Sequence, residues 1–173
     1  MSRAFGLSIL LLFPAAVGAQ ETAPAAPLPP TPQPSYATDS AAIHRVVVSL
    51  FDGMRTRDTA AMRALFHEPM AMRSAYIRQG VNTISADGIE GWFKGIGSAP
   101  DTLLLDERLG PPEIRVDGNL ASMWVYYEFY AGDNFSHCGV DSIQFGRTDD
   151  GWKIILLSDS KRRTECAKSL PKS

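Results

Sequence analysis

Three side chains in the second half of the chain have the chemistry to move protons. Glu128, His137 and Asp141 lie on two consecutive stretches that read as neighbouring strands, within "YYEFYAGDNFSHCGVDSIQF" at 126–145. Carboxylate and imidazole groups are the usual general acids and bases of enzymes. Asp141 is therefore the first candidate for a catalytic base. In an alternative arrangement His137 moves the proton and Glu128 orients its ring.

Each of these residues also has a purely structural interpretation. Glu128 and His137 can form an ion-pair network with Arg162 that closes the open end of a sheet. Asp141 can be a buried polar anchor that is hydrogen-bonded to Ser158 and a tyrosine hydroxyl. Structural networks of this kind are common in proteins, so the catalytic roles are hypotheses.

Alternation along the predicted strands indicates which side chains share a face. Successive side chains of a strand point to opposite faces of the sheet, and a two-residue turn near Asp133 pairs even positions before it with odd positions after it. This register places His137 and Asp141 in a ligand pocket. The further lining residues it predicts are Trp124, Tyr126, Ser158 and Arg162 from the strands, and Trp92 from a helix. The tryptophans can equally be core residues, and a β-bulge would exchange the two faces beyond it.

In the same register, the opposite face of the sheet is apolar in its middle. Val125, Tyr127 and Phe129 would lie there, with no predicted element to cover them. Because exposed apolar patches of this size mark interaction surfaces, we expect a homodimer through this sheet face.

The two cysteines, Cys138 and Cys166, are predicted to form a disulfide. The chain begins with "MSRAFGLSILLLFPAAVGAQ", which is typical of a signal peptide cleaved near Ala19. An exported chain meets an oxidising compartment, so we expect a periplasmic or secreted protein with paired thiols. The sequence shows no metal-ligand pattern, phosphate loop or nucleophile elbow, so we expect neither a metal nor a cofactor.

The composition of successive segments along the chain predicts one exported domain with short extensions at both ends. We expect a signal peptide at 1–19, a flexible linker rich in Pro and Ala at 20–37, a folded domain at 38–166 and a C-terminal tail at 167–173. The 173 residues carry a net charge of −2 and no basic stripe. This excludes a nucleic-acid-binding surface and, after signal cleavage, an electrostatic membrane-binding surface.

Helical patterns come first in the predicted domain and strands follow. Apolar spacings of three and four residues predict helices over 39–58, 59–68 and 85–97. Asp58 and Ser85 are the expected N-caps of the second and third helices. Tight turns at 117–118, 132–134 and 148–151 join the later strands. This order predicts an α+β fold with one curved antiparallel sheet and helices across one face.

The layout resembles a known superfamily. Two N-terminal helices, a third helix at "IEGWFKGI" and a long meander ending in "DGWKI" are similar to the nuclear transport factor 2-like superfamily, in particular its SnoaL-like branch. The resemblance covers 40–166. It implies a cone-shaped sheet with the N-terminal helices packed on its concave face, a pocket between them, and dimers through the sheet.

The superfamily includes ketosteroid isomerase, scytalone dehydratase and polyketide cyclases beside binding domains, so it does not fix a function. The active site of ketosteroid isomerase would need a second aspartate near Asp141 and Tyr126. That of scytalone dehydratase would need paired histidines and paired tyrosines. Neither set can be carried over, since no clear second aspartate is present and His137 is the only histidine of the predicted sheet.

Three functions remain open from the sequence. The first is binding of a small apolar ligand in the pocket. The second is a cofactor-free isomerase, cyclase or dehydratase that uses Asp141 or the Glu128–His137 pair as its base. The third is a dimeric protein-interaction module.

Overall fold

The computed structural model describes residues 36–85 and 88–172. The predicted signal peptide and all but the last two residues of the predicted linker lie outside the described residues. The first helix, α1, begins at Tyr36 and ends at Thr56. This described helix begins three residues before the start that the sequence predicts for it.

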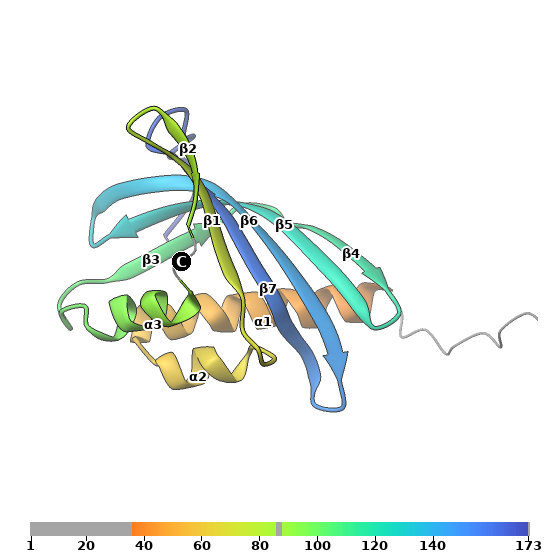
Figure 1. Cartoon of the computed structure of the whole chain (residues 1–173). Helices are drawn as coiled ribbons and strands as arrows, with labels where there is room; N and C mark the ends of the chain where they lie inside the picture. The colour runs from red at the N-terminus through yellow and green to blue at the C-terminus, as the bar shows by residue number, and fades with distance from the viewer. Residues whose placement is uncertain (1–35, 86–87, 173) are drawn as a thin grey trace, which may run out of the picture. The chain divides into compact units, whose positions relative to one another are not determined.

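Three helices lie along one face of a curved sheet (Figure 1). They are α1, α2 (Thr59–Ala64) and α3 (Ile89–Gly97). Asp58 caps α2 as expected, since its Oδ1 accepts a hydrogen bond of 2.9 Å from the Ala61 N–H. Ser85 does not cap α3, whose N-cap is Gly88. The Ser85 N–H instead donates to the Ser74 carbonyl at the edge of the sheet. No helix in the described part of the chain is long and apolar enough to span a membrane.

The sheet has seven strands and does not close into a barrel. The strands are β1 (Met72–Arg78), β2 (Val81–Ile84), β3 (Leu105–Leu109), β4 (Glu113–Asp117), β5 (Leu120–Ala131), β6 (Asn134–Thr148) and β7 (Gly151–Lys161). Their order is β2-β1-β7-β6-β5-β3, with β4 pairing the first half of β5. The α+β class and the helix-covered concave face are confirmed. All neighbouring strands are antiparallel, as predicted, except β1 and β7, which run parallel. These two strands are joined by a long crossover that contains β2 to β6.

A β-bulge near the turn between β5 and β6 changes the predicted register. Tyr130 pairs with Phe135, as a two-residue turn requires, but Phe129 pairs with His137 and leaves Ser136 as the extra residue. Beyond the bulge, odd positions pair with odd ones and even with even, such as Val125 with Asp141 and Tyr126 with Val140. The prediction that Trp124, Tyr126 and Glu128 share a face with His137 and Asp141 is therefore wrong. These three side chains lie on the convex face.

A second bulge separates the two halves of β7. Phe145 pairs with Ile154 and Gln144 with Leu156, so Ile155 is the extra residue. Trp152 and Ile154 lie on the concave face as predicted, but beyond the bulge the parity changes. Ser158, which pairs with Ser142, and Arg162, which bridges Cys138, fall on the convex face. The predicted place of Ser158 beside His137 is wrong, and Asp159 and Lys161 lie on the concave face instead. Arg162 still lines a cavity together with His137.

The residues predicted to form a dimer surface belong to the core. Val125 and Tyr127 are each 1% exposed, and Phe129 packs against the same core under the helices. The convex face instead exposes Leu120 and Trp124.

The predicted disulfide between Cys138 and Cys166 is present. It joins β6 to the segment after β7, and the C-terminal tail continues across the end of the sheet. There the Ser169 and Leu170 N–H groups donate to the two carboxylate oxygens of Glu128, at 3.0 and 3.2 Å. The tail therefore covers Glu128, which has no exposed surface.

Candidate active site

A cavity of about 520 Å³ lies between α1, α3 and the concave face of the sheet. We call it the inner cavity. Its walls are mainly apolar, with Phe51, Met54, Trp92, Ile96, Leu105 and Phe129 among them. Six polar side chains interrupt them: Glu107, Tyr127, His137, Asp141, Asp159 and Lys161. Apolar walls with a few convergent polar groups are typical of a small-molecule site.

Two carboxyl groups share a proton at one side of the inner cavity. Glu107 on β3 and Asp141 on β6 point to the same face of β5, where they oppose Phe129 and Val125, and their side chains are hydrogen-bonded. Burial, and then the charge of Asp141, raises the pKa of Glu107 well above its ordinary value. Glu107 therefore carries the proton and donates it to the Asp141 carboxylate.

Asp141 is poised to accept a proton near neutral pH. Its side chain is buried, and burial followed by the charge of Asp159 raises its pKa to about 7, although the bond from Glu107 and the charge of Lys161 oppose the shift. One oxygen, Oδ2, has no hydrogen-bond partner among the described residues. A buried carboxylate oxygen without a hydrogen-bond partner lowers the stability of the folded protein. Asp141 lines the inner cavity, where a bound ligand can supply the missing partner.

Asp159, which pairs with Asp141 in the register of β6 and β7, is held by three neighbours. The Ser74 hydroxyl donates to Oδ1, and Lys161 Nζ lies 3.5 Å from Oδ2. The Tyr127 hydroxyl lies 3.3 Å from Oδ2 and 3.0 Å from the Ser160 carbonyl oxygen, so its proton is shared between them. Both carboxylate oxygens of Asp159 are therefore occupied by neighbouring groups. Burial and the neighbouring carboxylates raise the pKa of Tyr127, so its hydroxyl stays protonated as a donor.

Gly139 makes room for the tyrosine. It pairs with Tyr127 on β5, and a Cβ at this position would lie 2.9 Å from Tyr127 Cε1 and 1.7 Å from the Ser160 carbonyl oxygen. Only a residue without a side chain lets the two strands and the Tyr127 ring approach this closely.

His137 lies at the open end of the inner cavity. Its ring packs edge-on against Tyr127 and tilted against Phe129, with centroids 5.7 and 5.1 Å away. Burial, followed by the charge of Lys161, lowers the pKa of His137 to about 4. The imidazole is therefore neutral at physiological pH. No contact joins it to Glu128, so the predicted Glu128–His137 pair is wrong.

The structure brings together three of the eight predicted site residues, Trp92, His137 and Asp141, around the inner cavity. Trp124, Tyr126, Glu128 and Ser158 do not line it. Burial raises the pKa of Glu128, but hydrogen bonds from Ser169, Leu170 and the Tyr126 and Tyr130 hydroxyls outweigh it and lower the pKa overall. Glu128 is thus a charged anchor for the tail. No group of three His, Cys, Asp or Glu side chains that could hold a metal ion is found within 36–85 and 88–172.

Comparison with known proteins agrees with this architecture. Residues 35–157, more than two thirds of the chain, match the SnoaL-like domain family. The chain belongs to this family. No curated protein sequence matches this SnoaL-like chain significantly.

Solved structures share the fold at low sequence identity. An NTF2-like protein of unknown function from Shewanella baltica superposes with a TM-score of 0.60 at 16% identity, over 76% of this chain and 100% of its own. A protein of unknown function with a cystatin-like fold from Nostoc punctiforme gives 0.56 at 20% identity, over 78% and 96%. A candidate dehydratase of the NTF2-like family from Streptomyces avermitilis gives 0.52 at 15%, over 73% and 97%. These likenesses establish the fold of the SnoaL-like domain.

Sequence reasoning missed Glu107, Asp159, Tyr127 and Lys161. For Glu107 a signal was present, because in "LLLDERL" it alternates with Leu105 and Leu109 and so had to share their face. An acid between two leucines on one face of a strand points toward the core. For the other three, the face depended on the two bulges.

Proposed function

We propose that this SnoaL-like domain is an acid–base enzyme that moves a proton on a small, mainly apolar molecule bound in the inner cavity. Asp141 is the proposed base and Glu107 its proton-holding partner. One observation carries the proposal: a proton-sharing carboxyl pair beside an apolar cavity, with the Asp141 side chain buried and its Oδ2 atom unpartnered among the described residues.

The carboxyl pair has no apparent structural purpose. Burying acids next to one another costs stability, and apolar residues of similar volume would pack this site at lower cost. Glu128 shows what a structural carboxylate looks like in this chain, since both its oxygens accept bonds from the tail it anchors. Asp141 lacks that arrangement. Groups kept at such a cost cluster at functional sites.

The reaction class follows from the charges around the cavity. Asp141 takes a proton from a carbon beside a carbonyl group, the C–H electron pair moves toward the carbonyl oxygen, and an enolate forms. Lys161, the cation of the inner cavity, stabilises the developing charge on that oxygen. Protonated Asp141 returns the proton to another carbon in an isomerisation, or to a leaving hydroxyl group in a dehydration. The candidate dehydratase among the structural neighbours would catalyse a reaction of the second kind.

Binding of a small apolar ligand without turnover is the second candidate, favoured by the predominantly apolar walls of the same cavity. We also propose a periplasmic or secreted location, which the disulfide supports, and a homodimer, which exposed Leu120 and Trp124 support. Sedimentation of Trp124→Lys against the wild type tests the dimer.

Solvent deuterium exchange tests the proposed enzyme. A panel of small apolar ketones and enones is incubated with the protein in D₂O, and deuterium uptake is measured by mass spectrometry. We expect uptake with the wild type and with Asp149→Asn, an exposed turn residue, and a loss of at least about 100-fold with Asp141→Asn. Panel members that bind in the cavity but exchange equally in wild type and Asp141→Asn would leave only the binding function.

A further inference from the structure

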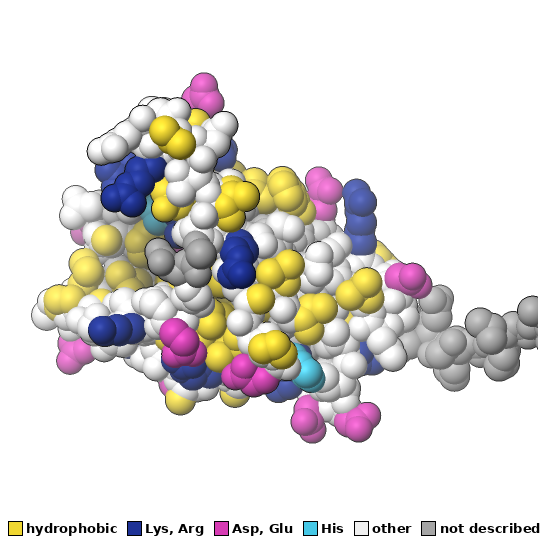
Figure 2. Space-filling model, in the orientation of Figure 1, with side chains coloured by type: hydrophobic (Ala, Val, Ile, Leu, Met, Phe, Trp, Pro, Cys, Tyr) yellow, Lys and Arg dark blue, Asp and Glu magenta, His cyan; other side chains and the backbone are white. Residues whose placement is uncertain are grey.

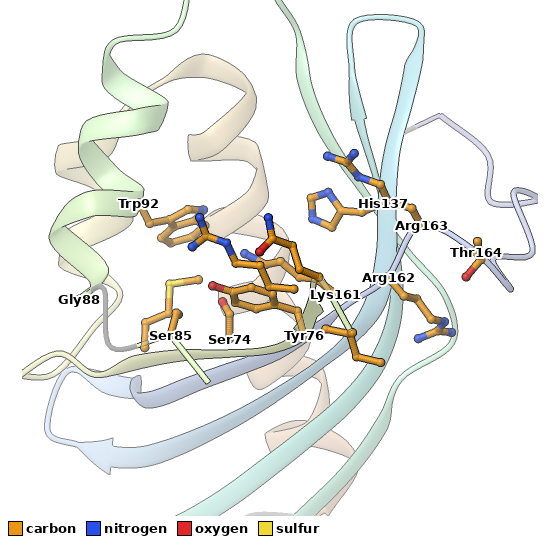
Figure 3. Close-up of a pocket in the computed structure, with 14 residues that line it drawn as sticks. Ser74, Tyr76, Ser85, Gly88, Trp92, His137, Lys161, Arg162, Arg163 and Thr164 are labelled. Carbon is orange, nitrogen blue, oxygen red and sulfur yellow. The ribbon is translucent and has the colours of Figure 1, made fainter. Parts of the chain in front are cut away.

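A larger cavity adjoins the inner one. This outer cavity has a volume of about 880 Å³ and lies between the β1–β2 hairpin, the start of α3 and the end of β7 with the segment after it (Figure 3). Met72, Trp92, His137 and Lys161 line both cavities. One bound molecule can therefore extend from the carboxyl pair, past Trp92, to the outer opening.

The two cavities differ in charge. The inner one contains Glu107, Asp141 and Asp159, whereas the described residues that line the outer one include four cations and no carboxylate. The four are Arg78, Lys161, Arg162 and Arg163. In Figure 3, Arg163 extends beside His137 while Arg162 points away from the cavity. On the face shown in Figure 2, Lys and Arg side chains lie just below the tip of the β1–β2 hairpin, beside hydrophobic ones.

Two of these cations have no partner within the described part of the chain. The Arg78 and Arg163 side chains make no hydrogen bond or ion pair there. This contrasts with Arg63, Arg55 and Arg108, which are all paired with carboxylates. The unneutralised charges face a shared concavity, where fields add and are screened less than on an open surface.

We propose that the outer cavity binds an anionic group of the same molecule whose apolar body fills the inner cavity. This inference rests on the proposed function. The ligand class is an amphipathic acid, with a carboxylate, phosphate or sulfonate at one end of an aromatic or alicyclic body. Arg78 and Arg163 attract the anion, while Asp141 and Asp159 repel it from the inner end. This polarity fixes one orientation, in which the apolar end of the molecule lies next to Asp141.

Two fluorescent probes that differ by one anionic group test the inference. Anilinonaphthalene sulfonate and neutral phenylnaphthylamine have the same aromatic body, and their dissociation constants are measured by titration at low salt. We expect the sulfonate to bind the wild type about tenfold more tightly than the neutral probe, equivalent to about 1.4 kcal/mol. The double variant Arg78→Gln/Arg163→Gln should bring the two constants within about twofold. Arg115→Gln, on exposed β4, is the matched control and should keep the preference.

A cavity-filling variant shows whether the probes bind inside. Gly95 lines the inner cavity, and a Cβ there meets no atom within 4 Å, so the first carbon of the leucine side chain in Gly95→Leu fits without a clash. We expect it to weaken both probes. Competition by naphthyl phosphate and by naphthoate then assigns the anion as phosphate or carboxylate.

Four results would overturn the inference. Equal affinity for the two probes, or a preference that survives in the double variant, removes the anionic site and leaves the inner cavity as proposed. Sulfonate binding that Gly95→Leu does not affect places the probe on the surface and also overturns the inference. Failure of both probes to bind contradicts the inner cavity as a ligand site and the proposed function with it.

Discussion

Glu107 on β3 and Asp141 on β6 share a hydrogen bond across the strand that separates them. Neither β3 nor β6 alone provides the pair. It forms because the bulge at Ser136 turns Asp141 to the face of the sheet on which Tyr127 and Glu107 lie. The local irregularity that hides the site from sequence reasoning is thus the feature that assembles it.

The substitution Asp141→Asn should stabilise the fold at alkaline pH. The folded protein holds the Asp141 proton up to about pH 7, whereas the unfolded chain releases it near 4. Between these values the folded state binds more protons, so the wild type loses stability as pH rises, and the penalty is complete above 7. We expect the variant to exceed the wild type by about 1–3 kcal/mol at pH 8.5, with a smaller gap at pH 5. Denaturant unfolding at both pH values measures the gap, and a variant less stable at pH 8.5 would contradict this account.

The imidazole of His137 should remain neutral well below its ordinary range. Burial, then the charge of Lys161, gives it a pKa of about 4. The unfolded chain takes up this proton near pH 6.5, so this residue costs stability as pH falls from 6.5 toward 4. A titration of the histidine ring carbons by NMR checks the value, with His137→Asn used to assign the signal. A midpoint near 6.5 would mean that the ring is solvated and lies outside the cavity.

The cavity-lining glycine Gly95 offers a test of ligand access without loss of fold. We expect Gly95→Leu to abolish deuterium exchange on the ketone panel, since the added side chain occupies the substrate volume. Because leucine is the better helix former, α3 should not lose stability. Trp124→Ala, on the convex face, is the control and should leave exchange unchanged. Exchange in Gly95→Leu at the wild-type rate would place the reaction elsewhere.

The disulfide and Glu128 should act together to hold the C-terminal tail. Removing the disulfide in Cys138→Ala/Cys166→Ala should lower the free energy of unfolding by about 2–4 kcal/mol. Glu128→Gln weakens the acceptor for the Ser169 and Leu170 N–H groups, at about 1–3 kcal/mol. If the two features hold one segment, the combined loss should be smaller than the sum. Strict additivity in denaturant unfolding would show that they act separately.

The fold was predictable from local patterns, and half of the site was not. Helical spacing, the Asp58 cap and the tight turns depend on near neighbours, which the sequence displays directly. The faces of β5 and β7 depend on two extra residues, Ser136 and Ile155, and neither residue type marks a bulge. The sequence therefore places His137 and Asp141 on the cavity face correctly. It also predicts Glu128 and Ser158 there, where the structure has Tyr127 and Asp159.

The protonation of Asp141 is the most direct test of the central claim. With carboxyl-labelled aspartate, a carbon NMR titration follows each side chain, and Asp141→Asn identifies the signal of interest. We predict a midpoint near pH 7 that moves toward the ordinary aspartate value in Asp159→Asn, which removes the neighbouring charge that raises it, and that rises further in Glu107→Ala, which removes the hydrogen bond that lowers it. A wild-type midpoint near 4 would mean that the carboxylate is solvated and unstrained. That result would contradict the raised pKa of a buried Asp141 beside the inner cavity, which is the observation that supports the proposed proton transfer.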